Sequence, residues 1–190
     1  FILSQIPSTF TVAPQLPSAS GYLVEIDSQT SLAGTADAAT TRKVLVNGLE
    51  TSWNVLEGRW SIQSVPLLPG INSVLVQAIA ADGREIQQQR IDIWRDTGRV
   101  SRQGGMLAGD TEWKADDGPY HVNETIVVPS NVTLTIKPGT SVYFEPGTGI
   151  LVHGRLLAEG TEERRIRFTR PPGGNSTWAG IEFNGASTES

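Results

Sequence analysis

Short runs of β-branched and other apolar residues recur between Thr125 and Phe183, and corners that contain glycine or proline separate them. The runs occupy residues 126–128, 132–136, 142–144, 150–152, 155–158, 166–168 and 181–183. Runs this short do not form helices, and glycine and proline at such intervals mark tight corners. The pattern predicts evenly spaced short strands, which are found in sandwiches, barrels and β-solenoids.

The corners favour the solenoid among these three folds. Asn-Gly, a strong signal for a tight hairpin, does not occur between successive runs in this stretch. An apolar run, a Pro-Gly or Gly corner and another apolar run follow one another instead, for example around Pro138-Gly139. This order suits a chain that coils in one direction.

Three segments carry a resemblance to a known family. They are VTLTIKPGT at residues 132–140, GRLLAEGT at residues 154–161 and WAGIEF at residues 178–183. Together they resemble the opening coils of right-handed parallel β-helix proteins, a group that includes pectate-lyase-like enzymes and many secreted bacterial surface proteins. The resemblance covers about residues 107–186 and implies a fold more than a function. Since a solenoid needs about three or more repeats and a cap, we expect further coils beyond Ser190.

A different pattern fills residues 21–96, where longer alternating runs are separated by turn signals such as Asn47-Gly48 and Asp82-Gly83. Strands spaced by about 8–12 residues predict an immunoglobulin-like sandwich. The strings LAGTA (32–36), VLVNG (44–48), GRWS (58–61) and LPGIN (68–72) are similar to the immunoglobulin-like domain B of glucodextranase. That resemblance implies a module of secreted multidomain bacterial proteins, without an active site of its own.

The predicted fold class is therefore all-β, with an immunoglobulin-like sandwich followed by the N-terminal coils of a right-handed parallel β-helix. Residues 1–20 carry three prolines and predict a linker or an edge strand. Residues 97–118 are rich in glycine and polar residues and predict a connection. Residues 119–190 are assigned to the solenoid, and we expect its chain to be truncated.

Composition excludes some function classes. The net charge of −5 argues against nucleic-acid binding, which needs clustered lysine and arginine. No apolar run approaches the ~20 residues of a membrane-spanning helix. Cysteine is absent, so neither a disulfide nor a thiol contributes. Together with the resemblances, these features lead us to expect an extracellular or cell-surface location.

Four carboxylates, Asp110, Glu112, Asp116 and Asp117, lie close together in the glycine-containing connection. Hard oxygen ligands of this kind bind calcium, which takes six to eight of them. Their spacing matches no EF-hand loop, and a solvated acidic segment is the alternative interpretation. Calcium is the one cofactor that the sequence suggests.

Three aromatic residues, Trp113, Tyr120 and Trp178, are candidates for stacking on sugar rings. We expect Trp113 and Trp178 to be partly exposed, because one lies in the connection and the other follows a Pro- and Gly-rich loop. The alternative is that a half-buried tryptophan covers a solenoid end.

No catalytic residue is predicted. Glu145, Glu159 and Glu182 lie on candidate coils, but the hydrolase, P-loop and dinucleotide motifs are absent. The leading hypothesis is a non-catalytic structural or binding segment of a secreted or cell-surface multidomain bacterial protein that adheres to polysaccharide or other surface components. The alternatives are the N-terminal part of a polysaccharide lyase or hydrolase with its active site downstream, and a dedicated carbohydrate-binding module. The open solenoid end is also a candidate for self-association by strand addition.

Overall fold

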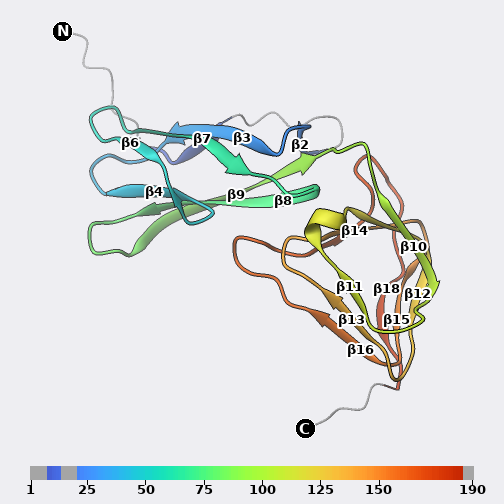
Figure 1. Cartoon of the computed structure of the whole chain (residues 1–190). Coiled ribbons are helices and arrows are strands. Elements are labelled where there is room, and N and C mark those ends of the chain that lie inside the picture. Colours follow the sequence, from blue (N-terminus) through green and yellow to red (C-terminus); the bar gives the residue numbers. More distant parts are fainter. Residues whose placement is uncertain (1–7, 14–20, 186–190) are drawn as a thin grey trace.

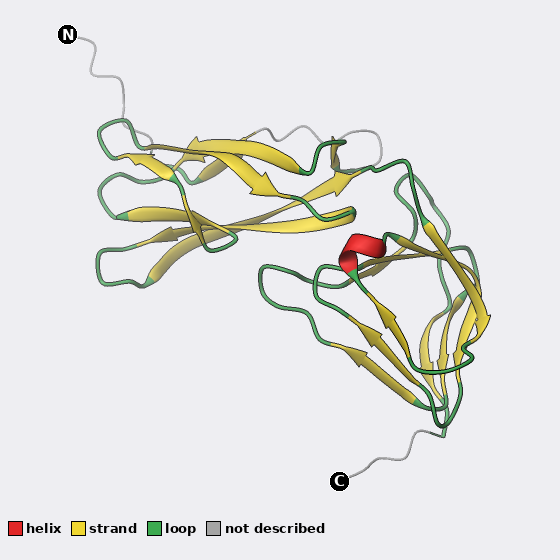
Figure 2. Cartoon of the chain, viewed as in Figure 1, coloured by secondary structure: helices red, strands yellow, loops and turns green. Residues whose placement is uncertain are grey.

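The computed structural model describes residues 8–13 and 21–185, which form antiparallel sheets followed by a parallel β-solenoid of about three turns (Figure 1). Figure 2 shows strands throughout both parts and, among the described residues, one short helical turn, η1 (Ala115–Asp117). The prediction of an all-β chain that combines antiparallel sheets with parallel coils is thus confirmed. We call the two parts the sandwich and the solenoid.

The sandwich consists of two sheets. One has the order β1-β3-β7-β6 and the other has the order β2-β9-β8-β4-β5. The strands are β1 (Thr11–Ala13), β2 (Leu23–Glu25), β3 (Gln29–Thr35), β4 (Lys43–Val46), β5 (Leu49–Glu50), β6 (Ser52–Asn54), β7 (Arg59–Pro66), β8 (Gly70–Ile79) and β9 (Glu85–Arg95). All pairings in the two sheets are antiparallel except that of β2 with β9.

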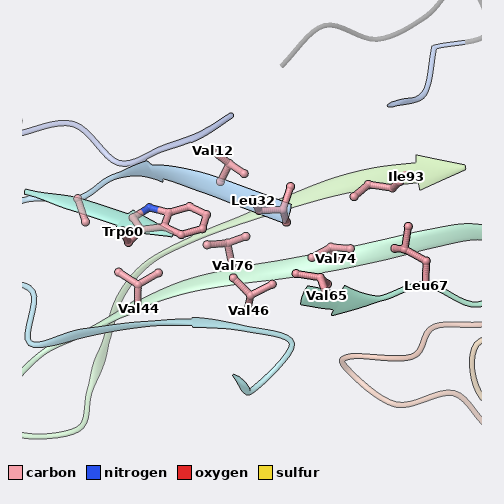
Figure 3. Packing of buried hydrophobic residues seen from close by; sticks show 11 residues of the cluster. Val12, Leu32, Val44, Val46, Trp60, Val65, Leu67, Val74, Val76 and Ile93 are labelled. Atoms are coloured by element: carbon pink, nitrogen blue, oxygen red, sulfur yellow. The ribbon is translucent and has the colours of Figure 1, made fainter. Parts of the chain in front are cut away.

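The inner faces of the two sheets share one apolar core. Trp60, which is 2% exposed, reaches from β7 toward the valines of β4 and β8 (Figure 3). Val12 and Leu32 contribute from the first sheet, and Ile93 contributes from the second. This core is the product of the period-2 alternation that predicted the strands.

Two local predictions in the sandwich can be compared with the structure. Asn47-Gly48 joins β4 to β5 with φ values of 47° and 77°, the two positive values that a type I′ turn requires. In the N-terminal segment, β1 pairs antiparallel with β3 at the edge of its sheet, as in the edge-strand interpretation of residues 1–20. Residues 1–7 and 14–20 of that segment lie outside the described residues.

Among the described residues, every strand pair of the solenoid is parallel. Its strands are β10 (Ser101–Met106), β11 (Thr111–Trp113), β12 (Tyr120–Val128), β13 (Thr133–Ile136), β14 (Ser141–Phe144), β15 (Gly149–Val152), β16 (Arg155–Ala158), β17 (Arg167–Thr169) and β18 (Gly180–Phe183). The long strand β12 pairs with β14 through its first half and with β15 through its second half. Like residues therefore stack from coil to coil, for example Ile126, Ile150 and Ile181.

The structure corrects the predicted connection over residues 97–118. β10 and β11 lie within it, and they pair in parallel with β12 and β13 as the first coil of the solenoid. The sequence hides this coil because β10 contains no apolar triplet: Gly104 and Gly105 interrupt it where its register with β12 shifts. A polar, bulged strand at the end of a solenoid discourages further pairing.

Candidate functional site

The most unusual surface of the solenoid is the outward face of β14. In a strand, alternate side chains point to opposite faces, and Val142 and Phe144 belong to the solenoid core. Ser141 and Tyr143 therefore point outward, yet they are only 1% and 3% exposed. The reason is that the sandwich covers them.

Ser141 contacts the first residues of β8. Its hydroxyl accepts a hydrogen bond of 2.8 Å from Ile71 N and lies 3.3 Å from Ile71 O, to which it donates. Gly70, with φ of +95°, lets the backbone approach this closely, because a Cβ there would lie 2.5 Å from Ser141 Cβ. Asn72 fixes the preceding turn, since its amide bonds Leu68 N and Leu68 O, each at 2.8 Å.

Charged groups join the two parts on either side of this contact. Arg167 of β17 forms an ion pair with Asp92 of β9, and both side chains are about one-third exposed. Arg90 of β9 donates to Glu162 O at 3.0 Å and to a Glu162 carboxylate oxygen at 3.2 Å. Both pairs link the second sandwich sheet to solenoid residues.

Tyr143 fills the same interface. Burial raises the pKa of its phenol, because the charged phenolate is disfavoured away from water. Within the described residues, its hydroxyl has no hydrogen-bond partner. The side chain therefore contributes apolar packing between the two parts and stays neutral at physiological pH.

Two of the predicted sugar-stacking residues do not face solvent. Trp113 and Tyr120 are 2% and 4% exposed, and their rings stack on each other with centroids 4.8 Å apart. The expectation that Trp113 is partly exposed was wrong, because the polar segment around it is itself a coil and its side chain points into the core. The Tyr120 hydroxyl accepts a 3.0 Å hydrogen bond from Lys114 N, which supplies a polar partner inside the solenoid.

Trp178 is half-buried, as the sequence suggested. One face of its ring stacks on Phe144, with centroids 4.4 Å apart and planes inclined by 13°. Trp178 also lines a cavity of about 280 Å³ together with Tyr22, Thr169, Arg170, Ser176 and Thr177. Trp178 therefore borders an open cavity.

The four candidate calcium ligands are divided between separate interactions. Asp110 accepts a 2.8 Å hydrogen bond from Thr133 N, and Glu112 forms ion pairs with Lys114 and Lys137 at 3.3 and 3.0 Å. Asp116 and Asp117 are both exposed on η1. Across residues 8–13 and 21–185, no three acidic or histidine side chains gather in a metal-binding group.

The environment of Glu112 gives a testable pH dependence. Its hydrogen bond with Lys137 holds the pKa of the carboxyl below its ordinary value, and Lys114 acts in the same direction more weakly. Because the pKa is depressed in the folded state, the stabilisation is present above the unfolded-state pKa and is lost as the pH falls through the folded-state pKa. We expect an NMR titration of the Glu112 side chain to show a pKa below that of an ordinary glutamate, which rises in Lys137→Gln and rises less in Lys114→Gln. An unchanged midpoint in Lys137→Gln would contradict this assignment.

The three glutamates considered for catalysis have different neighbours. Glu145 Oε1 lies 2.8 Å from His121 Nε2. Glu182, on β18, accepts a 3.4 Å hydrogen bond from the Asn184 amide, and Glu159 is exposed after β16. The structure therefore gives each of them a separate environment.

The residues that join the two parts were not singled out by the sequence. Ser141, Asp92 and Arg167 have no distinctive motif around them. Leu68-Pro69-Gly70-Ile71-Asn72 was noted as part of a family resemblance and not as a contact. Alternation along β14 could have placed Ser141 and Tyr143 on one outward face, but not what covers that face.

Comparisons with known proteins give one partial relationship. Eighty residues of the chain are 36% identical to Protein bark beetle of Drosophila melanogaster, and this match covers 42% of the chain and 2% of that protein. No family model and no solved structure matches the chain. The relative is an animal protein, so the comparisons lend no support to the bacterial origin that the resemblances implied. As for membrane insertion, the described residues contain no helix with the length and apolar character needed to cross a bilayer.

Proposed function

We propose that this chain is a non-catalytic structural segment of an extracellular or cell-surface multidomain protein, in which an immunoglobulin-like sandwich is fixed at a set angle to the beginning of a parallel β-helix. The observation that carries the proposal is the complete burial of Ser141 and Tyr143 on the outward face of β14. Such a face is ordinarily solvated. Its burial supports the proposal that the two parts stay in contact.

The contact has the features of an interface that resists rotation. The two buried hydrogen bonds between the Ser141 hydroxyl and the backbone of Ile71 are directional. Losing them leaves the N–H and C=O groups of Ile71 without these partners inside the protein. The ion pairs Arg167–Asp92 and Arg90–Glu162 lie at separate points. Several separated attachments restrict relative motion more than the same energy concentrated in one place, because a single contact leaves a pivot.

The location and the module type rest on the sequence resemblances. Immunoglobulin-like modules and β-helices are both used as spacers and display surfaces in large secreted proteins. The size of the partial relative supports a multidomain setting, since the matched segment is only 2% of its length. A segment that sets direction between neighbouring modules requires rigidity and no active site.

A distance measurement between two spin labels tests the rigid junction directly. The chain contains no cysteine, so Leu56→Cys on the sandwich and Met106→Cys on the solenoid provide two unique labelling positions, which are 81% and 72% exposed. We expect pulsed electron resonance to give one narrow distance distribution. A broad distribution in the otherwise unchanged protein would refute the proposal.

The same labelled protein shows which contacts hold the junction. Ser141→Ala combined with Arg167→Gln removes the buried hydrogen bonds and one ion pair, at a cost of about 1–3 kcal/mol for the unsatisfied groups of Ile71. We expect the distribution to broaden. Lys43→Gln, which removes the exposed Lys43–Glu50 pair within the sandwich, serves as the control and should leave the distribution narrow.

A further inference from the structure

A cavity of about 280 Å³ opens where the start of the sandwich meets the last coil of the solenoid. Tyr22 lines it from the residue before β2, Thr169 and Arg170 line it from the end of β17, and Ser176, Thr177 and Trp178 line it from the loop before β18. Its volume is near the lower end of the range for small-molecule sites, which starts at roughly 300 Å³. It is thus large enough for one sugar ring or a group of similar size.

The aromatic side of the cavity is held in place. The ring of Trp178 stacks on Phe144, which is 1% exposed in the solenoid core. Two backbone hydrogen bonds fix the loop that carries it, from Gly147 N to Thr177 O at 3.2 Å and from Ala179 N to Thr148 O at 2.7 Å. An aromatic wall that is already ordered loses little entropy when a ligand binds.

The polar side of the cavity is open to solvent. Arg170, Ser176 and Thr177 are exposed and Thr169 is half-buried, so a ligand in the cavity can reach their side chains. Hydroxyl groups both donate and accept hydrogen bonds. The guanidinium of arginine presents a planar fork that binds a carboxylate through two parallel hydrogen bonds.

These features together select one kind of ligand. It must offer an apolar ring face to the aromatic residues, hydroxyl groups to the serine and threonines, and a planar anion to Arg170. We propose that this cavity binds a carboxylate-bearing pyranose, that is, one acidic sugar unit of a glycan. The cavity is lined from both parts, so this proposal rests on the rigid junction. Its test separates the two, since a narrow spin-label distribution without glycan binding would overturn the sugar site and leave the rigid junction standing.

The test is an NMR titration of the ¹⁵N-labelled chain with two glycans that differ in charge. A hyaluronan tetrasaccharide carries a carboxylate on alternate sugars, whereas chitotetraose consists of neutral N-acetylated sugars of the same ring size. We expect the hyaluronan fragment to shift the indole signal of Trp178, identified by its loss in Trp178→Phe, in a saturable way. Chitotetraose should bind at least about tenfold more weakly, which is the factor for one charge-assisted hydrogen bond.

Two matched arginine variants identify the charge that matters. Arg170 and Arg155 are both exposed, and Arg155 lies on β16 outside the cavity. Arg170→Gln should weaken hyaluronan binding at least about tenfold, whereas Arg155→Gln should leave it unchanged. Absence of binding, equal binding of the two glycans, or equal loss in the two variants would each overturn the proposal. Because both substitutions are on the surface, their spectra should otherwise match that of the unchanged protein.

Discussion

Replacing Gly70 by alanine is expected to destabilise the chain by about 2–5 kcal/mol and to loosen the sandwich from the solenoid. Gly70 has φ of +95°, a conformation that costs a residue with a Cβ about 1–2 kcal/mol. The added Cβ would also lie 2.5 Å from Ser141 Cβ and 2.6 Å from Ser141 Oγ, an overpacking that costs about 1–3 kcal/mol. Denaturant unfolding measures the loss, and the spin-label distribution of the labelled protein should broaden at the same time.

Gly48→Ala is the matched control for this prediction. Gly48 also has a positive φ, +77°, but a Cβ there would meet no atom within 4 Å. It therefore carries the backbone strain without the collision, and we expect a loss of about 1–2 kcal/mol with a narrow spin-label distribution. Equal losses in the two variants, or an unchanged distribution in Gly70→Ala, would show that the contact at Ser141 does not hold the two parts together.

The architecture was predictable from the sequence because it depends on local patterns. The apolar triplets and their Pro-Gly corners fix the period of the strands, and Asn47-Gly48 selects a hairpin whose turn geometry the structure reproduces. The first coil was missed for the opposite reason. Ser101–Met106 has no apolar triplet, and it is held in place by pairing with β12, a contact that no local pattern reveals.

The candidate sites were harder to predict because they depend on distant contacts. Trp113 lies in a polar segment, and only its stacking on Tyr120 and its burial show that it is a core residue. Trp178 was correctly placed at the surface, but the arginine and hydroxyl groups beside it come together through the coiling of the chain. Ser141 becomes important only because the start of β8 packs against it.

Phe144→Ala is expected to be the most damaging substitution in the last coils, with a loss of about 3–5 kcal/mol. Phe144 is 1% exposed, and its ring lies 4.4 Å from that of Trp178 and 6.4 Å from that of Phe168, measured between centroids. Removing it leaves a cavity beneath both aromatic rings. Within the described residues, the last coil packs against a neighbouring coil on one side. We therefore expect the backbone amides of β17 and β18 to lose their protection from hydrogen exchange first, and an exchange measurement on these amides tests this.

Phe183→Ala gives the comparison, because it removes the same side chain from the neighbouring coil. Phe183 is 60% exposed, so its truncation leaves no buried cavity and should change the stability by no more than about 0.5 kcal/mol. If both variants lose similar stability, Phe183 contributes as much to the solenoid end as the buried residue, and the core would extend through the last coil. A large loss confined to Phe144→Ala instead places the boundary of the packed core at the Phe144–Trp178 stack. The wall of the proposed sugar cavity would then rest directly on the edge of that core.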